Sequence, residues 1–229
     1  MRLALLVIFL LAGCHTDKIH YDGQRFLGAQ YINSPLGEEK LPDTDPLIRF
    51  DAFDCTTFVE TVLANGDIQK LNHIRYKNGK IDFLNRNHFI ESDWLTNNAD
   101  IVQNVTHQYG PTDVRTVTID KKNWFKTAHN IYTEHAPETV HIEYLPYNNI
   151  SKIQNKETLI VLFITDNPKI RDKIGTDLAV VHMGLLLPNG VLRHASSVHK
   201  QVIDVDFYEY INQQRQNKNN IGITLVAIK

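Results

Sequence analysis

The chain is poor in cysteine and carries no excess of either charge. Two cysteines in 229 residues can form neither a disulfide framework nor a four-thiolate zinc site. The 24 lysines and arginines balance 26 aspartates and glutamates, so the basic surface that nucleic-acid binding requires is missing. A hydrophobic content of 42% with 22% charged residues is typical of a globular protein, and the length suits one sizeable domain. We therefore expect no nucleic-acid partner.

A long apolar run occurs at the N-terminus, from Leu3 to Leu11 behind Arg2. The run is too short for a stable transmembrane helix, which needs about 20 residues, and it predicts a signal peptide. It ends in Leu-Ala-Gly-Cys, which resembles the bacterial lipoprotein signal, in which the cysteine is lipidated and becomes the first residue. The resemblance implies a signal peptide at 1–13, a lipid anchor on Cys14 and a tether at 14–21. His15 in place of Asp favours the outer membrane, facing the periplasm; the alternative is an ordinary signal peptide, or a short anchor, with a chance cysteine.

The first half of the remaining chain is predicted to be mainly helical. A helix is expected over 22–33, and the best helix of the chain over 55–65, where Asp54 is a good N-cap and Gly66 a good stop. Asn78-Gly79 indicates a tight hairpin turn, and residues 91–98 a short helix.

The second half of the chain is predicted to form a β-sheet. Strands are expected at 114–119, 139–145, 158–165, 178–187, 190–196 and 221–228. Helices followed by strands predict an α+β fold. We expect a single domain over 22–229, in which residues 99–157 form an insertion.

Cys55 stands in the first turn of the strongest predicted helix. Free backbone N–H groups and the helix dipole favour a thiolate there, and the same N–H groups can hold a developing oxyanion. Such a thiolate needs an imidazole beside it to act as base and then as acid. The other interpretation is an inert cysteine buried with Phe58, Val59 and Val62 on one stripe of the helix.

Strand register predicts that two histidines meet on a hairpin at residues 180–196. Residues 187–190 fit a type I turn followed by a left-handed glycine. Pairing positions 187 and 191 sets Gly184 opposite His194 and His182 opposite Ser196, all on one face. His182 and His194 are then diagonal neighbours about 7 Å apart at Cα, so one imidazole can pair with the thiol while the other orients it. The opposite face, expected in the core, carries Val181, Met183, Leu185 and Leu187.

These motifs resemble those of the NlpC-type papain-like cell-wall cysteine hydrolases. The resemblance rests on Asp54-Cys55-Thr56-Thr57-Phe58, then His182-Met183-Gly184, then His194-Ala195, with twelve residues between the histidines. Further stretches are similar to one branch of that superfamily, the N-acetylmuramoyl-L-alanine amidase-like family: Phe26-Leu27-Gly28, Ile74-Arg75-Tyr76, Arg86-Asn87-His88-Phe89 and Ser92-Asp93-Trp94. The chain departs from the superfamily in two places. Thr56-Thr57 replaces Ser-Gly, as in the branch, and Lys156-Glu157-Thr158 replaces a Gly-Asp turn.

The resemblance implies a papain-like fold, with the catalytic cysteine at a helix N-terminus packed on an antiparallel sheet that carries the histidines. It implies hydrolysis of the amide between N-acetylmuramic acid and L-alanine in peptidoglycan fragments, through a thioester on Cys55. His182 acts as base and acid and His194 orients it. No cofactor or metal is expected.

Arg86, His88, Phe89 and Trp94 are expected to line the substrate cleft, where a sugar stacks on an aromatic ring and Arg86 grips a carboxylate. Ser196 and Tyr31 are further candidates for substrate contact. The alternative for the cluster is a surface loop whose Phe89 and Trp94 fill the core. The remaining histidines, among them His129, show no metal-ligand spacing and are expected at the surface.

Three other functions stay open from the residues alone. The same triad could cleave the γ-D-glutamyl–diaminopimelate bond, as NlpC-type endopeptidases do. The chain could be a wall-binding lipoprotein without activity, although binding alone needs no thiolate. The paired histidines could instead hold zinc, in which case a chelator would abolish activity.

Overall fold

The computed structural model describes residues 21–35 and 37–229. The expected signal peptide, the lipidation residue Cys14 and all but the last residue of the expected tether lie outside these residues. Within the described chain, no helix is both long and apolar enough to cross a membrane.

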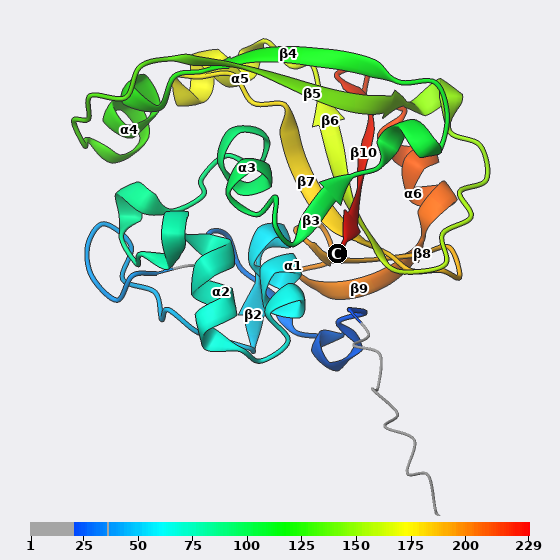
Figure 1. The fold of residues 1–229 in the computed structure, drawn as a ribbon, viewed down its shortest axis with the longest axis horizontal. Coiled ribbons are helices and arrows are strands. Elements are labelled where there is room, and N and C mark those ends of the chain that lie inside the picture. The colour runs from blue at the N-terminus through cyan, green and yellow to red at the C-terminus, as the bar shows by residue number, and fades with distance from the viewer. Residues whose placement is uncertain (1–20, 36) are drawn as a thin grey trace, which may run out of the picture.

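Ten strands of the described residues form one large sheet, in the order β2-β1-β9-β8-β7-β6-β10-β5-β4, with β3 paired to β10 (Figure 1). The pairing of β1 with β2 is parallel, and the central strands pair antiparallel. The strands are β1 (Gln30–Tyr31), β2 (Ala52–Phe53), β3 (Val102–Asn104), β4 (Asp113–Ile119), β5 (Glu138–Pro146), β6 (Leu159–Thr165), β7 (Val180–Leu186), β8 (Val191–Ser196), β9 (Gln201–Asp206) and β10 (Asn220–Ile228).

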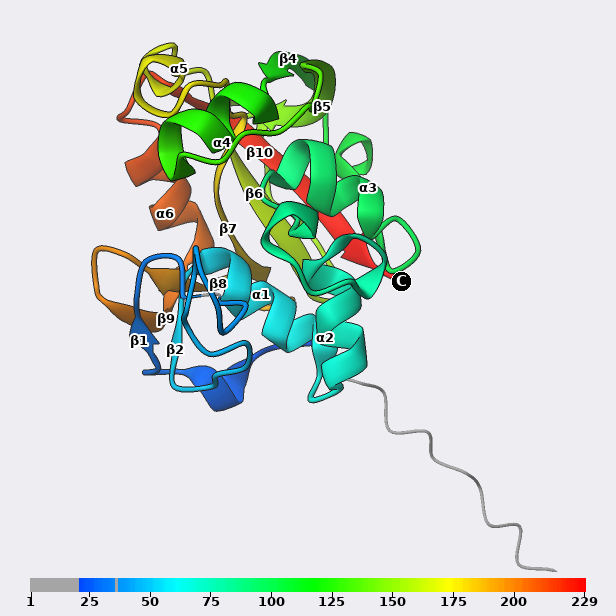
Figure 2. The same cartoon turned by 90° about the vertical axis from the view of Figure 1, so that its left-hand side faces the viewer.

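Helices cover both faces of this sheet, with α6 on one side of the central strands and α2 and α3 on the other (Figure 2). One core lies under α1 and includes Ile160, Leu162 and Met183, while the second lies under α6 and includes Phe163 and Leu192. The predicted α+β class is therefore confirmed. The helices are α1 (Cys55–Ala64), α2 (Ile68–Arg75), α3 (Leu95–Asn97), α4 (Lys121–His129), α5 (Lys169–Ile174) and α6 (Phe207–Gln214).

Helix α1 begins where the sequence predicts. The Asp54 carboxylate accepts the Thr57 backbone N–H at 2.8 Å, and the Thr57 hydroxyl accepts the Asp54 N–H at 3.0 Å. This reciprocal capping box satisfies two donors that a helix start leaves without intrahelical partners. Asn65, in the left-handed conformation at φ 49°, ends the helix one residue before Gly66. Cys55 is thereby fixed as the first helical residue.

The helix expected over 22–33 is wrong. That stretch forms a single 3-10 turn, Gln24–Phe26, and then strand β1, which lies between β2 and β9. Phe26 inserts between the rings of Phe53 and Phe58, with ring centroids 5.1 and 6.5 Å away. Packing against these rings and pairing with β2 and β9 outweigh local helix preference.

The remaining predictions are mostly confirmed. Residues 91–98 form a π-helix, Ile90–Trp94, followed by α3, and all six expected strands are present. Asn78 does sit in a tight turn at φ 56°, but it follows helix α2 and no hairpin flanks it. Helices α2, α4, α5 and α6 and strand β9 were not predicted. Residues 99–157 supply β3, α4 and the long β4–β5 hairpin, which extends the sheet beyond β10 (Figure 1).

Candidate active site

The β7–β8 hairpin has the predicted register. Leu187 donates its N–H to the Val191 carbonyl at 2.9 Å, and Gly190 closes the turn at φ 80°. Gly184 lies against His194, because a Cβ at position 184 would come within 2.9 Å of the His194 Cβ. Only glycine leaves room for the imidazole there.

His182 and His194 meet on this hairpin, as the register predicts. Nε2 of His182 lies 2.8 Å from Nδ1 of His194, and the two rings are nearly perpendicular at 81°. His194 is 2% exposed and His182 is half-buried. The Tyr210 ring of α6 packs 5.0 Å from the His194 ring, and Phe163 of β6 packs 5.5 Å from the His182 ring. The two imidazoles are therefore held as one unit.

A β-bulge precedes His182. Phe163 of β6 pairs with His182, but the next residue, Ile164, pairs with Val180 and leaves Val181 as the extra residue. Val181 is consequently 43% exposed, and its expected place in the core is wrong; Met183, Leu185 and Leu187 are buried as expected. A bulge re-aims the side chains next to it, and here it sets the direction of the His182 imidazole.

Glu91 holds the strand just before this bulge. The Ala179 backbone N–H donates to Glu91 Oε1 at 2.5 Å, and a Val180 backbone hydrogen bond also stabilises the carboxylate. Glu91 is 4% exposed, and burial raises its pKa to about 7. This role was not predicted from the sequence, because Glu91 stands beside Ser92 and Asp93 and nothing in that stretch distinguishes it from a surface carboxylate.

Cys55 lies beside the same strand. The Thr56 hydroxyl is 3.9 Å from the sulfur, and the Met183 and Thr56 backbones act to lower the pKa of the thiol. Met183 directly follows His182 on β7, and α1 packs against this strand. Tyr31 of β1 lies within electrostatic range of the site, since burial and then the charges of Cys55 and Asp54 raise its pKa.

The site is uncharged at rest. Burial and the neighbouring Asp54 raise the pKa of the Cys55 thiol to about 12, although the two backbone N–H groups act in the opposite direction. Burial and the His194 ring lower the pKa of His182 to about 3, and burial lowers that of His194 to about 4. The backbone at the helix start acts toward a thiolate, as expected, but desolvation is the larger effect on the thiol pKa. At neutral pH the site holds a thiol and two neutral imidazoles.

His194 leaves one ring nitrogen without a partner. Its Nε2 is buried and has no hydrogen-bond partner among the described residues. If His182 keeps Nδ1 free to accept a proton, its Nε2–H donates to His194 Nδ1, and His194 then carries its own proton on the unpartnered Nε2. An unsatisfied buried donor costs about 1–3 kcal/mol, a cost that this tautomer carries.

Ser196 lies beside the histidines. It is 4% exposed, and its hydroxyl accepts the His199 N–H at 3.1 Å. Together with His182 and His194 it lines a cavity of about 480 Å³ at the surface next to α6. Tyr31, Cys55, His182, His194 and Ser196 are thus the predicted residues that the fold brings to one region.

The predicted cluster at 86–94 is not assembled as expected. Phe89 and Trp94 are 2% and 0% exposed, and the Trp94 indole donates to Glu60 Oε1 at 3.1 Å. Rings this buried have no face open to a sugar, so their expected place in the cleft is wrong and the core-filling alternative holds. Apolar side chains next to a helix start give no indication of which face will be covered.

Arg86 and His88 contact other groups of the same chain. Arg86 Nη1 lies 3.4 Å from Asp43 and 3.8 Å from Glu38, so its expected carboxylate partner is supplied by neighbouring side chains. His88 Nε2 lies 2.6 Å from the Phe83 carbonyl, and burial lowers the His88 pKa to about 3. Within the described residues, no group of three or more His, Cys, Asp or Glu side chains has a geometry that could hold a metal ion.

A thiol at a helix start beside a bonded histidine pair, on an α+β fold, defines a candidate hydrolase. The model of the N-acetylmuramoyl-L-alanine amidase-like family matches residues 21–222, and the chain belongs to this family. It is therefore an amidase-like hydrolase of the peptidoglycan-cleaving kind. No curated protein matches the chain.

Solved structures of other proteins are similar to this chain over most of its length. A protein from Legionella pneumophila is similar at TM-score 0.81 and 25% identity, over 90% of this chain and 86% of that one. An N-acetylmuramoyl-L-alanine amidase from Bacteroides uniformis is similar at TM-score 0.69 and 26% identity, over 90% of this chain and 95% of that one.

Proposed function

We propose that the chain hydrolyses the amide between the lactyl carbonyl of N-acetylmuramic acid and L-alanine, with Cys55 as nucleophile in a papain-like arrangement. The observation that carries the proposal is the 2.8 Å contact between His182 and His194 on the hairpin against which α1, beginning at Cys55, packs. The family and the Bacteroides uniformis amidase support the choice of bond.

The neutral site favours proton transfer concerted with attack. As the Cys55 sulfur bonds to the lactyl carbon, its proton moves to His182 Nδ1, and the charge on the carbonyl oxygen develops against the free N–H groups at the start of α1. His182 then gives the proton to the departing alanine nitrogen as the C–N bond breaks. Water, deprotonated by His182, attacks the thioester and releases N-acetylmuramic acid, and the sulfur takes the proton back as the thiol.

His194 accepts the Nε2–H of His182 throughout this cycle. This contact directs Nδ1 of His182 toward the sulfur and stabilises the imidazolium that forms on attack. His194 thereby acts as a positioning residue, because it touches neither the sulfur nor the substrate.

Identification of the reaction products shows which amide bond of the substrate is cleaved. The purified chain without its signal peptide is incubated with N-acetylmuramoyl-L-alanyl-γ-D-glutamyl-diaminopimelate, and products are identified by mass spectrometry. Free N-acetylmuramic acid and an intact tripeptide are the expected products. Free diaminopimelate would instead make the chain an endopeptidase with the same nucleophile. Activity that disappears with EDTA and returns with zinc would replace the cysteine mechanism.

We further propose that the protein is anchored by lipid on Cys14 at the outer membrane, facing peptidoglycan fragments in the periplasm. The support is the apolar run ending in Leu-Ala-Gly-Cys and the family's peptidoglycan substrate. Labelled fatty acid should be incorporated into the wild-type protein and not into Cys14→Ser. Equal labelling of both proteins would contradict the anchor.

A further inference from the structure

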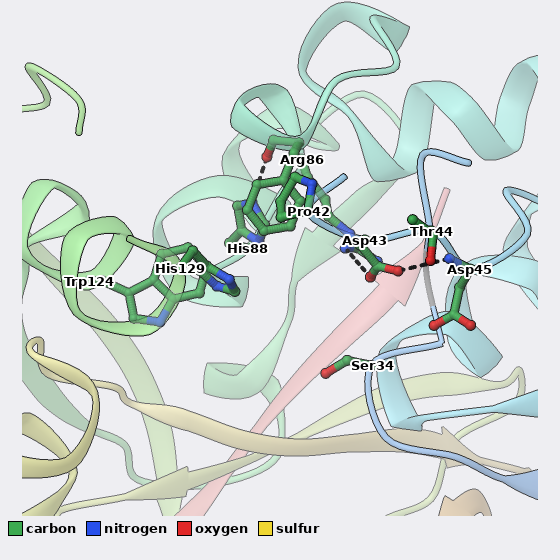
Figure 3. Close-up of a pocket in the computed structure, with 10 residues that line it drawn as sticks. Ser34, Pro42, Asp43, Thr44, Asp45, Arg86, His88, Trp124 and His129 are labelled. Carbon is green, nitrogen blue, oxygen red and sulfur yellow. Dashed lines mark hydrogen bonds and ion pairs between the residues drawn. The ribbon is translucent and has the colours of Figure 1, made fainter. Parts of the chain in front are cut away.

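Two of the cavities in the described chain differ in how they relate to the candidate active site. One, of about 400 Å³, lies between α4 and the loop before β2, where Arg86 is directed at Asp43 (Figure 3). Trp124 and His129 line its other side, and His129 is half-buried there although the sequence predicts it at the surface. Among the described residues, no hydrogen bond or ring contact joins the lining of this cavity to Cys55 or to the histidine pair.

The other cavity, of about 480 Å³, lies beside the histidine pair, and α6 forms one of its walls. Tyr210 of α6 lines it together with His182 and His194. The Tyr210 ring centroid lies 5.0 Å from that of His194 and 6.3 Å from that of His182. It also packs edge-on against Phe163 of β6, at 5.2 Å. Two aromatic rings, one from the sheet and one from the helix, therefore pack against the hydrogen-bonded pair.

Helix α6 is tied to the hairpin that carries the histidines. The Asp206 carboxylate caps the helix, and the Phe207 N–H donates to the Gly190 carbonyl at 3.0 Å. Phe207 and Ile211 are 0% and 2% exposed, so the helix is anchored in the core beneath it. Because Gly190 closes the β7–β8 turn, these contacts fix the position of Tyr210 relative to the hairpin.

The His194 imidazole depends on packing for its orientation. Its Nδ1 contact to His182 is the one hydrogen bond that the ring makes among the described residues, since Nε2 has no partner there. A half-turn about the Cβ–Cγ bond would carry Nδ1 away and break this contact. Apart from His182, Tyr210 supplies the one aromatic ring that packs against His194 in the described chain. Close packing of that ring opposes the rotation.

The Tyr210 hydroxyl plays no part in holding the helix. It makes no hydrogen bond among the described residues, and the residue is half-buried in the cavity wall. The hydroxyl of the neighbouring Tyr208, in contrast, accepts the Ile153 N–H at 2.7 Å. Burial and then the charge of Cys55 raise the pKa of Tyr210 to about 12, so the phenol is neutral and lies within electrostatic range of the sulfur. The fold therefore makes use of the Tyr210 ring.

The ring also keeps water from the contact between the imidazoles. Water would compete for His194 Nδ1 and for the His182 Nε2–H, and a hydrogen bond is stronger where the dielectric constant is low. Burial is the largest cause of the low pKa of His182, about 3, and of His194, about 4. For His194, His199 lowers the pKa further and Asp204 raises it. Admitting water to the pair should raise the pKa of both imidazoles.

We infer that Tyr210 is a positioning residue for the histidine pair. Its ring keeps the His194 imidazole turned so that Nδ1 accepts the His182 Nε2–H, and it excludes water from this contact. The inference rests on the proposed function only for the link between the histidine pair and catalysis. Tyr210 acts in this role through the two histidines.

Three substitutions on α6 test the inference. Tyr210→Leu should lower kcat on N-acetylmuramoyl-L-alanyl peptide about 10–100-fold with KM nearly unchanged, because His182 is no longer held in place. Tyr210→Phe keeps the ring and should stay within about threefold of the wild type. Tyr208→Leu, the matched control, removes a neighbouring ring that packs 5.1 Å from Phe207, and it should also stay within about threefold.

The pH profile separates positioning from a general loss of packing. Water admitted by Tyr210→Leu raises the pKa of His182, so the acid limb of kcat/KM should move to higher pH by about one unit. Tyr210→Phe should leave this limb in place. Equal losses in Tyr210→Phe and Tyr210→Leu would overturn the inference, because the hydroxyl would then be the active part. An equal loss in Tyr208→Leu, or an acid limb that does not move, would overturn it as well.

Nitrogen NMR of the histidines tests the inference without substrate. The imidazole signals of His194, assigned with the His194→Asn variant, should titrate at higher pH in Tyr210→Leu than in the wild type and in Tyr210→Phe. Identical titration in all three proteins would overturn the positioning role even if the wild type is active. If the shift is present but the wild type cleaves no muropeptide, the proposed function fails and the inference stands. Tyr210→Gln replaces Tyr210→Leu if the latter does not fold, and it should show the same shift.

Discussion

Helix α1 takes part in two buried polar clusters that differ in how completely their groups are paired. At its middle, Glu60 accepts hydrogen bonds from Arg75 Nε at 3.1 Å and from the Trp94 indole at 3.1 Å. The other Arg75 nitrogens donate to the Leu47 carbonyl at 2.7 Å and the Thr61 hydroxyl at 3.4 Å. At its first residue, the Cys55–His182–His194 cluster leaves His194 Nε2 unpaired among the described residues.

The two clusters differ in role: the Glu60 cluster, the anchor, stabilises the fold, whereas the Cys55 cluster is the proposed reactive site. In the Glu60 cluster both carboxylate oxygens accept hydrogen bonds, and Arg75 opposes the burial that raises the Glu60 pKa to about 7. Loss of either partner leaves the other buried without its counter-ion. In the Cys55 cluster burial keeps the thiol and both imidazoles neutral, so the proposed proton transfer from the thiol must accompany attack on the substrate. One helix thus joins a fully hydrogen-bonded cluster to a neutral one in which a ring nitrogen of His194 has no partner among the described residues.

The largest expected effect is at the reactive end. Cys55→Ala should lower kcat/KM by about 10⁴-fold or more, because no other group can form the thioester. Its melting temperature should stay within a few degrees of wild type. Hydrolysis of a defined muropeptide and thermal denaturation measure the two. Unchanged activity would contradict the nucleophile.

The largest effect on stability is expected at the anchor. Arg75→Leu should cost about 3–5 kcal/mol in the free energy of unfolding, because Glu60 is left buried and unpaired. Arg49→Leu removes an exposed pair with Asp51 and should cost less than about 1 kcal/mol. Urea titration of both variants checks the contrast. If both variants lose a similar free energy of unfolding, the Glu60–Arg75 pair stabilises the fold no more than an exposed ion pair does.

Removing the orienting histidine should have an intermediate effect on activity. His194→Ala should lower kcat by about 10²–10³-fold with little change in KM, because His182 loses the acceptor for its Nε2–H. His194→Asn offers a carbonyl oxygen in its place and should recover part of the loss. If Asn gives no recovery over Ala, His194 serves packing alone.

A change at Glu91 is expected to lower activity less than a change at His194. Glu91→Gln keeps one acceptor for the Ala179 N–H, and should lower kcat about threefold to tenfold by loosening the strand before the bulge. In the wild type, the Glu91 pKa is raised to about 7, above its value in the unfolded chain. The charged form is thus the strained one, and its contribution to stability falls as pH rises from about 4.5 to 7. Denaturation of both proteins across this range should show a smaller fall in the variant.

The smallest effect distinguishes a resting thiol from a resting thiolate. With its pKa raised to about 12, Cys55 should react slowly with iodoacetamide at pH 7, and the rate should rise with pH through 9. The small model thiol N-acetylcysteine sets the reference rate. A rate independent of pH between 5 and 8 would indicate a thiolate–imidazolium pair and contradict the neutral site.

Local rules were sufficient to predict the helix start at Cys55 and the meeting of His182 and His194. The cap on α1 depends on residues 54–57, and the histidine pair follows from the turn at 187–190, so short-range geometry determines both. The bulge at Val181 was not predictable, because it depends on how β7 pairs with β6 and on the Glu91 contact from a distant segment.

The substrate cluster could not be predicted for a related reason. Which of several aromatic rings is exposed depends on how the β4–β5 hairpin and α4 pack over residues 83–94. Trp94 and Trp124 look alike in sequence, but the first is completely buried and the second lines a cavity. Only tertiary packing distinguishes them.

The central claim, that Cys55 carries the acyl group, is tested most directly by trapping it. Turnover of N-acetylmuramoyl-L-alanyl peptide is quenched with acid, and the proteolytic fragment that contains Cys55 is weighed by mass spectrometry. The account predicts a fragment heavier by the muramoyl group, absent in Cys55→Ala. Continued turnover by Cys55→Ala, with the wild-type fragment unmodified, would contradict it.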